Sequence, residues 1–285
     1  MAIIFALIAF VGWGVGDIFG GTVSRKIGGH SSAFWSYVFC LIFASFYIPF
    51  AGNPLKHLTL QSGLILLILI PIGMVPLITL YEGIKVGNAS LVGTIGASFA
   101  ALAVVFSIIF LGDKINLNQA ISIVIIFTGL ILSSLDLKAF NLKQLTTDKG
   151  VPFALISMFF WAIYFTFVRI PIRQMGWFWP AYLSLCGFPL VLIFMRLKKI
   201  ELKFPRERKI FICSILNSLL LCAALFAFNI AVEKGQTAIV APISGAYPVL
   251  FASIAYFVFK DRLNKQQISG IVITLIGIVL LSSLS

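Results

Sequence analysis

The stretch that decides the fold is residues 87–134, GNASLVGTIGASFAALAVVFSIIFLGDKINLNQAISIVIIFTGLILSS, because the chain repeats it as residues 235–282, GQTAIVAPISGAYPVLFASIAYFVFKDRLNKQQISGIVITLIGIVLLS. At this constant offset of 148, thirteen of 48 positions are identical. Apolar composition produces some chance matches, but it does not explain aligned polar residues. The aligned polar pairs are Asp113/Asp261, Asn116/Asn264 and Gln119/Gln267, and the same offset links Trp13 to Trp161. The chain therefore consists of two copies of one sequence repeat.

The composition requires lipid as the solvent of this chain. Hydrophobic residues make up 60% of its 285 residues, charged residues only 11%, and the mean hydropathy is +1.09. A soluble domain could not cover so much apolar surface with so few polar side chains. The net charge of +12 does not indicate nucleic-acid binding, because the 21 basic residues are scattered through short loops, with one denser run at 196–209. Basic flanks are common beside membrane helices.

Ten segments are long and apolar enough to cross a bilayer, which takes about 20 mostly apolar residues. Only helices are acceptable at that depth, since an open strand edge in lipid would leave backbone groups unsatisfied. We therefore predict an all-α integral membrane protein. The predicted spans are 2–22, 31–50, 61–84, 89–111, 117–135, 151–170, 176–196, 209–232, 237–259 and 265–284.

The number of spans in each repeat fixes the geometry of the two halves. Five is odd, so the second copy must enter the membrane from the opposite face, and the repeats are inverted about an axis in the membrane plane. We predict a first repeat over 1–140, a linker over 141–150 and a second repeat over 151–285. Internal repeats in a membrane protein are typical of a transporter whose site lies between the copies.

Short motifs recur in both copies. The first copy carries Trp13-Gly14, Gly87-Asn88-Ala89-Ser90, Leu111-Gly112-Asp113-Lys114 and Gly129. The second carries Trp161-Ala162, residues 231–243, Tyr247-Pro248, Lys260-Asp261-Arg262-Leu263 and Gly270. Together these motifs resemble the drug/metabolite transporter superfamily, in its EamA branch, over nearly the whole chain.

The resemblance implies ten helices in an inverted repeat around a central cavity, lined mainly by helices 1–4 and 6–9, with helices 5 and 10 at the periphery. It also implies a carrier of small metabolites in the inner (plasma) membrane with both termini in the cytoplasm. The charge count disagrees on orientation. If the N-terminus is inside, the outer loops hold 16 of the 21 basic residues, whereas cytoplasmic loops usually carry the excess.

Asp17 is the strongest candidate for a functional residue. Of nine acidic residues, it alone lies well inside an apolar segment, and an Asp at a helix centre costs about 2.5–3.5 kcal/mol on insertion scales. It would bind a cation or a substrate amine, or carry a coupling proton. Alternatively, it lies near the outer end of the first helix, wet or paired with Arg25 or Lys26. The second copy has Phe165 at this position, so the role is not symmetric.

Further candidate site residues are aromatic or polar side chains within or near the ends of the spans. Trp13 and Trp161 would form cavity walls that stack on a flat substrate or hold a cation, or would serve packing alone. Buried amides need partners from a neighbouring helix or a ligand. The full set of candidates beside Asp17 is Trp13, Tyr81, Glu82, Ser98, Trp161, Asn217, Asn229 and Tyr247.

Alternatives remain for the other members of this set. Ser98 and Tyr247 would offer hydroxyls to one substrate, although Ser98 also fits close helix packing, and Glu82 fits a solvated helix end. Prolines at 71 and 76 in the third span, and at 242 and 248 in the ninth, are expected to interrupt their helices.

The function expected from these features is secondary transport of a small solute, an amino acid or an organic cation, by alternating access, with export as the direction. Protons would couple through Asp17 or Glu82, and a facilitator or exchanger is equally open. No GxxxxGK[ST] loop occurs in the sequence, so we expect no ATP hydrolysis. Neither histidine lies within a predicted span, and no HExxH motif or carboxylate pair occurs, so we expect no enzyme activity. The sequence also has no histidine-rich cluster or CxxC pair, so we expect no cofactor or metal. The alternative is a channel or a lipid-handling protein. Solute and lipid are the expected partners, and a monomer and a homodimer both fit.

Overall fold

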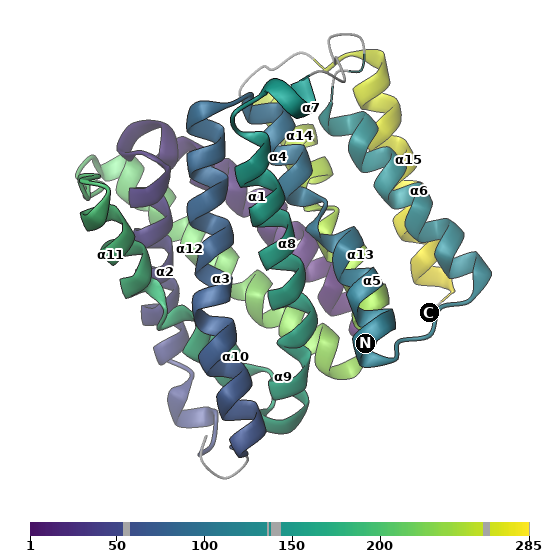
Figure 1. Ribbon diagram of the computed structural model, residues 1–285, viewed down its shortest axis with the longest axis horizontal. Coiled ribbons are helices and arrows are strands. Elements are labelled where there is room, and N and C mark those ends of the chain that lie inside the picture. Colours follow the sequence, from purple (N-terminus) through teal and green to yellow (C-terminus); the bar gives the residue numbers. More distant parts are fainter. Residues whose placement is uncertain (54–57, 136, 138–143, 259–262, 285) are drawn as a thin grey trace.

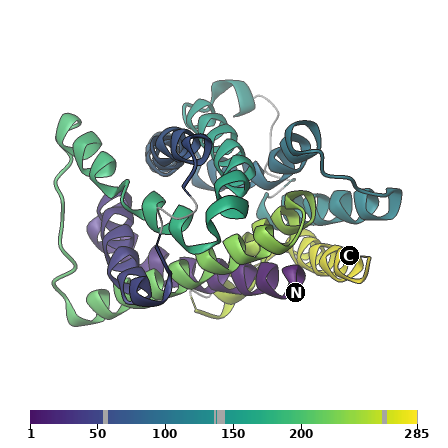
Figure 2. The same ribbon diagram turned by 90° about the horizontal axis from the view of Figure 1, so that it is seen from below.

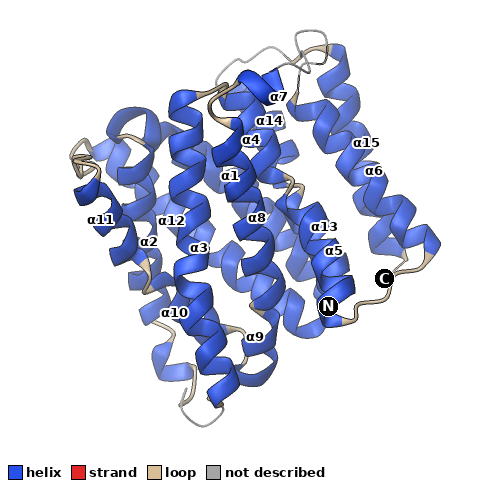
Figure 3. Cartoon of the chain, viewed as in Figure 1, coloured by secondary structure: helices blue, strands red, loops and turns tan. Residues whose placement is uncertain are grey.

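The computed structural model describes residues 1–53, 58–135, 137, 144–258 and 263–284. Helices and short loops make up all of these ranges (Figure 3). Within them, nine helical stretches are long and apolar enough to cross a membrane. The all-α membrane fold predicted from the sequence is therefore confirmed. Asp261 and residues 141–143 of the predicted linker lie outside the described residues.

The helices follow the predicted spans closely, and several spans consist of two helices each (Figure 1). The first half contains α1 (Ala2–Ile27), α2 (Gly29–Ser45), η1 (Ile48–Phe50), α3 (Leu60–Val86), α4 (Ala89–Ala97), α5 (Phe99–Leu111) and α6 (Leu117–Ser134). After the short α7 (Gln144–Thr147), the second half contains α8 (Val151–Phe167), α9 (Arg169–Met175), α10 (Phe178–Leu185), α11 (Phe188–Leu197), α12 (Arg208–Lys234), α13 (Thr237–Gly245), α14 (Tyr247–Val258) and α15 (Lys265–Ser283).

The second predicted span, 31–50, differs from the others in length. Its helix α2 has 17 residues, about 26 Å at 1.5 Å per residue, which is a little short of the roughly 30 Å hydrocarbon core. The 3₁₀ turn η1 follows it after two residues. This short helix is the reason that nine stretches, and not ten, meet the length requirement on their own.

The breaks in the fourth and ninth spans fall at repeat-related positions. Ser98 separates α4 from α5, and Ala246, 148 residues later, separates α13 from α14. The Ser98 hydroxyl donates to the carbonyl of Thr94 at 2.9 Å, a local bond that competes with regular helix geometry. The prolines differ in their effect. Helix α3 continues through Pro71 and Pro76, so these two do not end it, whereas Pro248 lies just after the break at Ala246, at the start of α14.

Contacts between the halves obey the inverted repeat. Gly87 lies against the backbone of Gly150, and the repeat-related Gly235 lies against the Ala2 side chain. A Cβ atom built on either glycine would lie 2.7 Å from an atom of that partner, closer than any real Cβ contact. Because Gly150 and Ala2 are also 148 positions apart, one contact becomes the other when the two halves are exchanged.

The capping of α6 and α15 explains the aligned Asn and Gln residues. The Asn116 side chain accepts from the backbone N–H of Gln119 at 2.9 Å, and the Gln119 side chain accepts from the backbone N–H of Asn116 at 3.0 Å. Asn264 and Gln267 make the same two bonds at the start of α15, at 2.8 and 3.0 Å. These reciprocal bonds satisfy N–H groups that a helix start leaves unpaired. The polar repeat pairs 116/264 and 119/267 therefore belong to the scaffold.

Helices α6 and α15 pack side by side at one edge of the bundle (Figures 1 and 2). Their contact uses Gly129, which lies against Thr274, and the repeat-related Gly277, which lies against Ile126. The largest cluster of buried apolar side chains is built mainly from α1, α5, α8, α12 and α13. Helices α6 and α15 join it through Ile123, Ile126, Ile278 and Leu281, which ties the edge pair to the body of the bundle.

Candidate functional site

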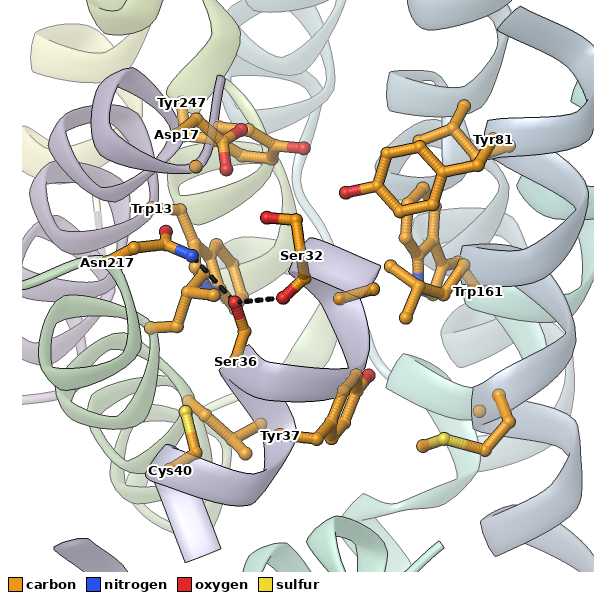
Figure 4. A pocket seen from close by; sticks show the side chains of 18 of the residues that line it. Trp13, Asp17, Ser32, Ser36, Tyr37, Cys40, Tyr81, Trp161, Asn217 and Tyr247 are labelled. Carbon is orange, nitrogen blue, oxygen red and sulfur yellow. Dashed lines mark hydrogen bonds between the residues drawn. The ribbon is translucent and has the colours of Figure 1, made fainter. Parts of the chain in front are cut away.

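A cavity of about 380 Å³ lies in the centre of the bundle and is lined by α1, α2, α3, α8, α12 and α14, among others (Figure 4). Its volume falls in the range of small-molecule sites, roughly 300–1,000 Å³. On α1 the lining residues are confined to 13–24, on α2 to 32–40 and on α3 to 73–81. These are the C-terminal half of α1, the N-terminal half of α2 and the C-terminal half of α3, so the cavity lies nearer the face at which α1 ends and α2 begins.

Helix α1 presents a stripe of small and polar residues to the cavity. Asp17, Gly20, Gly21 and Ser24 all line it, and their spacing of three, four and seven residues places them on one side of a helix. Trp13 lines the cavity one turn before Asp17. A Cβ atom built on Gly21 would meet nothing within 4 Å, so the cavity is open along this side of α1.

The carboxylate of Asp17 lacks a basic partner within the described part of the chain, where no Lys, Arg or His lies within 4.0 Å of it. Lys26, one of the two partners considered from the sequence, instead contacts Glu207 at 3.3 Å. No residue that lines the cavity in the described ranges is basic, and Asp17 is the acidic one among them. As far as the structure describes the chain, the cavity therefore carries one acid without a fixed countercharge.

A series of ring contacts connects the two repeat-related tryptophans along the lining of the cavity. Trp13 lies 5.7 Å from the ring of Phe165, which lies 5.0 Å from Phe99, which in turn lies 5.6 Å from Trp161. Trp13 also lies 5.8 Å from Tyr247, edge to face. All five residues line the cavity, and Figure 4 shows Trp13 and Trp161 on opposite sides of it. The two tryptophans thus lie on opposite walls of the cavity, and Phe165 and Phe99 connect those walls.

Polar groups from α2 and α12 complete the wall beside Asp17. The Asn217 amide donates from Nδ2 to Ser36 Oγ at 2.8 Å, and the Ser36 hydroxyl donates to the carbonyl oxygen of Ser32 at 2.8 Å. Sequence reasoning missed both serines, although their spacing of four residues inside an apolar span was the available signal. Tyr37 and Tyr164 also line the cavity and were missed.

Six of the nine residues expected from the sequence line this cavity: Trp13, Asp17, Tyr81, Trp161, Asn217 and Tyr247. The other three lie elsewhere. Glu82 Oε1 lies 3.3 Å from His30 Nε2, and Glu82 Oε2 lies 3.8 Å from Lys85. Asn229 is buried and donates to the carbonyl of Trp177 at 3.0 Å. Ser98 donates within its own helix.

A buried ion pair lies at the opposite face of the bundle. Arg169, at the start of α9, donates to Asp113, and both side chains are at most 6% exposed. The other Asp113 oxygen accepts the backbone N–H of Ala238 at 3.0 Å. Ala238 lies in the first turn of α13, shortly after Gly235, which packs on Ala2. The pair therefore lies near the N-terminal face and joins the end of α5 to two elements of the second half.

Comparison with known proteins agrees with this architecture. An uncharacterized transporter of Archaeoglobus fulgidus is 23% identical over 290 residues, which cover 99% of this chain and 98% of that protein. An uncharacterized protein of Methanocaldococcus jannaschii is 27% identical over 135 residues, 47% of this chain but 97% of that protein. The second relative is thus about as long as one repeat.

A protein of known crystal structure has the same fold, with a TM-score of 0.81 over 99% of this chain and 96% of its own, at 12% identity. The model of the EamA-like transporter family matches twice, at residues 1–135 and 148–283. The two matches cover both inverted halves and nearly the whole chain. The chain is therefore a multi-pass membrane protein that belongs to the EamA-like transporter family.

Proposed function

We propose that this transporter carries a small organic cation through the central cavity by alternating access. The observation that supports the proposal is the cavity itself: one carboxylate, Asp17, without a fixed countercharge, beside aromatic rings. A carboxylate attracts an ammonium group, and aromatic faces attract cations through the ring quadrupole. A bound cation would supply the charge that the described side chains do not.

A zwitterionic amino acid is the second candidate, and it fits the cavity less well. Its ammonium group would bind Asp17, but its carboxylate would need a basic side chain or a set of N–H donors. None of the lining residues within the described ranges is basic, and the buried Arg169 is already paired with Asp113. A phosphorylated solute is disfavoured for the same reason.

The transport cycle follows from the inverted repeats. Exchanging the conformations of the two halves would move the opening from one face to the other while Asp17 stays central. In this proposal the carrier exports its solute from the cytoplasm across the plasma membrane, with both termini inside, and Asp17 exchanges the cation for a proton. The functional repeats are 1–140 and 151–285. A channel or lipid-handling role would instead require passage without saturable binding at Asp17.

Reconstitution in liposomes tests the proposal. Radiolabelled organic amines should exchange across the membrane in a saturable manner, and Asp17→Asn should reduce exchange at least about tenfold because it removes the charge. Glu82→Gln is the matched control: it neutralises an acid of the same bundle that lies outside the cavity lining. Equal exchange by wild type and Asp17→Asn would refute the role of Asp17. A pH gradient that leaves wild-type flux unchanged would refute proton coupling alone.

A further inference from the structure

Asn217 stands out among the buried polar groups because its amide orientation is fixed. The Ser36 hydroxyl donates its hydrogen to the carbonyl oxygen of Ser32 at 2.8 Å, so it can only accept in its contact with Asn217 at 2.8 Å. The atom of the Asn217 amide that faces Ser36 must then be the donor, Nδ2. Oδ1, the acceptor, is left pointing away from α2.

That acceptor has no donor among the described residues. Asn217 is 3% exposed, and its Oδ1 lacks a hydrogen-bond partner. A buried acceptor without a partner costs about 1–3 kcal/mol, so the site is incomplete without a donor. Asn217 lines the cavity, so the donor is expected from a solute whose binding uncovers this buried oxygen.

The free oxygen points toward the helix that carries the carboxylate. A Cβ atom built on Gly20 would lie 3.1 Å from Asn217 Oδ1, and one built on Gly16 would lie 3.6 Å from it. Asp17 lies on α1 between these two glycines and on the same cavity-lining stripe as Gly20. Figure 4 shows Asn217 and Asp17 on the same side of the cavity, across from Tyr81.

We propose that Asp17 and the Oδ1 atom of Asn217 together bind an ammonium group that carries its own N–H donors, which makes Asn217 the residue that selects primary amines over quaternary ones. This inference rests on the proposed function, because it takes Asp17 as the cation-binding group. A primary ammonium has three N–H groups and can donate to both oxygens at once. A quaternary ammonium has none, so it satisfies the charge of Asp17 and leaves Asn217 Oδ1 unpaired.

The expected selectivity follows from the hydrogen bond that only the primary amine can make. A hydrogen bond between a neutral acceptor and a charged donor contributes enough to change affinity roughly tenfold to a hundredfold. The apolar part of the amine would lie toward the aromatic wall, where Trp161 and Phe99 contact each other at 5.6 Å between ring centroids. These ring contacts are made with the apolar part of the amine, so they do not distinguish a primary ammonium group from a quaternary one.

The test compares matched amines on the purified full-length protein in detergent. The probes are 2-phenylethylamine, butylamine and 1-naphthylmethylamine, each beside its N-trimethylated quaternary form, with binding measured by calorimetry. Wild type should bind each primary amine at least about tenfold more tightly than its partner. Asn217→Leu should remove this preference by weakening the primary amines and leaving the quaternary ones unchanged.

Asn229→Leu is the matched control. Asn229 lies on the same helix, is 1% exposed, donates from Nδ2 and also has an unpartnered Oδ1, but it does not line the cavity. Its substitution should lower the unfolding temperature without changing amine preference. If Asn217→Leu does not fold, Gly20→Ala provides the second variant, since its methyl group displaces Oδ1 and should weaken the primary amines selectively.

The outcomes separate this inference from the proposed function. Loss of primary-amine preference in Asn217→Leu or Gly20→Ala, with Asn229→Leu unaffected, supports the inference. Equal effects on both kinds of amine, or none, overturn it while binding that depends on Asp17 stands. A wild-type protein that binds no amine, or an Asp17→Asn variant that binds all of them normally, overturns the proposed function and the inference with it.

Discussion

Replacing Arg169 with Met should loosen the face of the bundle opposite the cavity. The Arg169–Asp113 pair is almost fully buried, at 6% and 3% exposure of the two side chains, and it joins the first half to α9 and α13 of the second. Removing one partner of a buried pair costs about 3–5 kcal/mol, because the remaining charge stays buried without compensation. In Arg169→Met, the Asp113 carboxylate would keep only the N–H of Ala238 at 3.0 Å.

Two measurements test this expected loss of stability. The unfolding temperature in detergent should fall by about 6–20 °C, on the scale of 2–4 °C per kcal/mol for chains of roughly 150–250 residues. Asp113→Asn should destabilise similarly, and the double variant should cost less than the sum of the two, because it leaves no unpaired charge. Additive effects of the two substitutions would refute direct coupling between the side chains.

The pair should also bias the transport cycle, since opening the N-terminal face must separate α5 from α9 and α13. A cysteine introduced at the fully buried Ala231, near Gly235 on this face, reports that opening by its rate of reaction with a maleimide. Replacing the four native cysteines with serine leaves this one thiol to react. Labelling should be faster in Arg169→Met than with Arg169 present. An unchanged labelling rate would refute the assignment of the pair as a lock.

Two further predictions concern the scaffold. Gly129→Ala should destabilise the protein by about 1–3 kcal/mol, because the added methyl group overpacks against the α15 backbone at Thr274. Gly93→Ala is the control and should be neutral or stabilising, because a Cβ atom there meets nothing within 4 Å. Equal unfolding temperatures for the two variants would contradict the close α6–α15 contact. Asn264→Ala should cost about 1 kcal/mol by removing the cap of α15, measured in the same way, and a wild-type unfolding temperature would show that the cap contributes nothing.

The sequence predicted the scaffold well because the repeat is a strong signal of geometry. Span positions follow from apolar length, and the inversion follows from an odd count. The identity of Asn116 with Asn264 could be seen without knowing its cause, which the structure shows to be helix capping. Helix breaks were harder to predict. Ser98 interrupts its span without a proline, while α3 passes through two prolines unbroken, because packing and side-chain bonds override local preference.

The candidate site was predictable only where composition made a residue conspicuous. Asp17 and the tryptophans are unusual in an apolar helix, and they line the cavity. Serines are common in membrane helices, so the spacing of Ser32 and Ser36 was too weak a signal to mark them as members of the wall. Asn217 and Asn229 looked equivalent in the sequence, and only the packing of α12 shows that the first faces the cavity and the second bonds to Trp177. Contacts between helices far apart in the chain carry that information.

The departures from symmetry indicate how the two end states differ. The repeat aligns Asp17 with Phe165, Asn217 with Leu69, and Arg169 with Gly21, so these three polar residues have no polar counterparts, whereas Ser36 aligns with Ser184 and Asp113 aligns with Asp261. Phe165 packs against Trp13 at 5.7 Å, which places an apolar ring where a symmetric site would have a second carboxylate. Gly21 lies where the opposite face would need an arginine to make the same pair. Because the Arg169–Asp113 pair ties α9 and α13 to the end of α5, we expect it to favour closure of its own face, with the cavity nearer the other face.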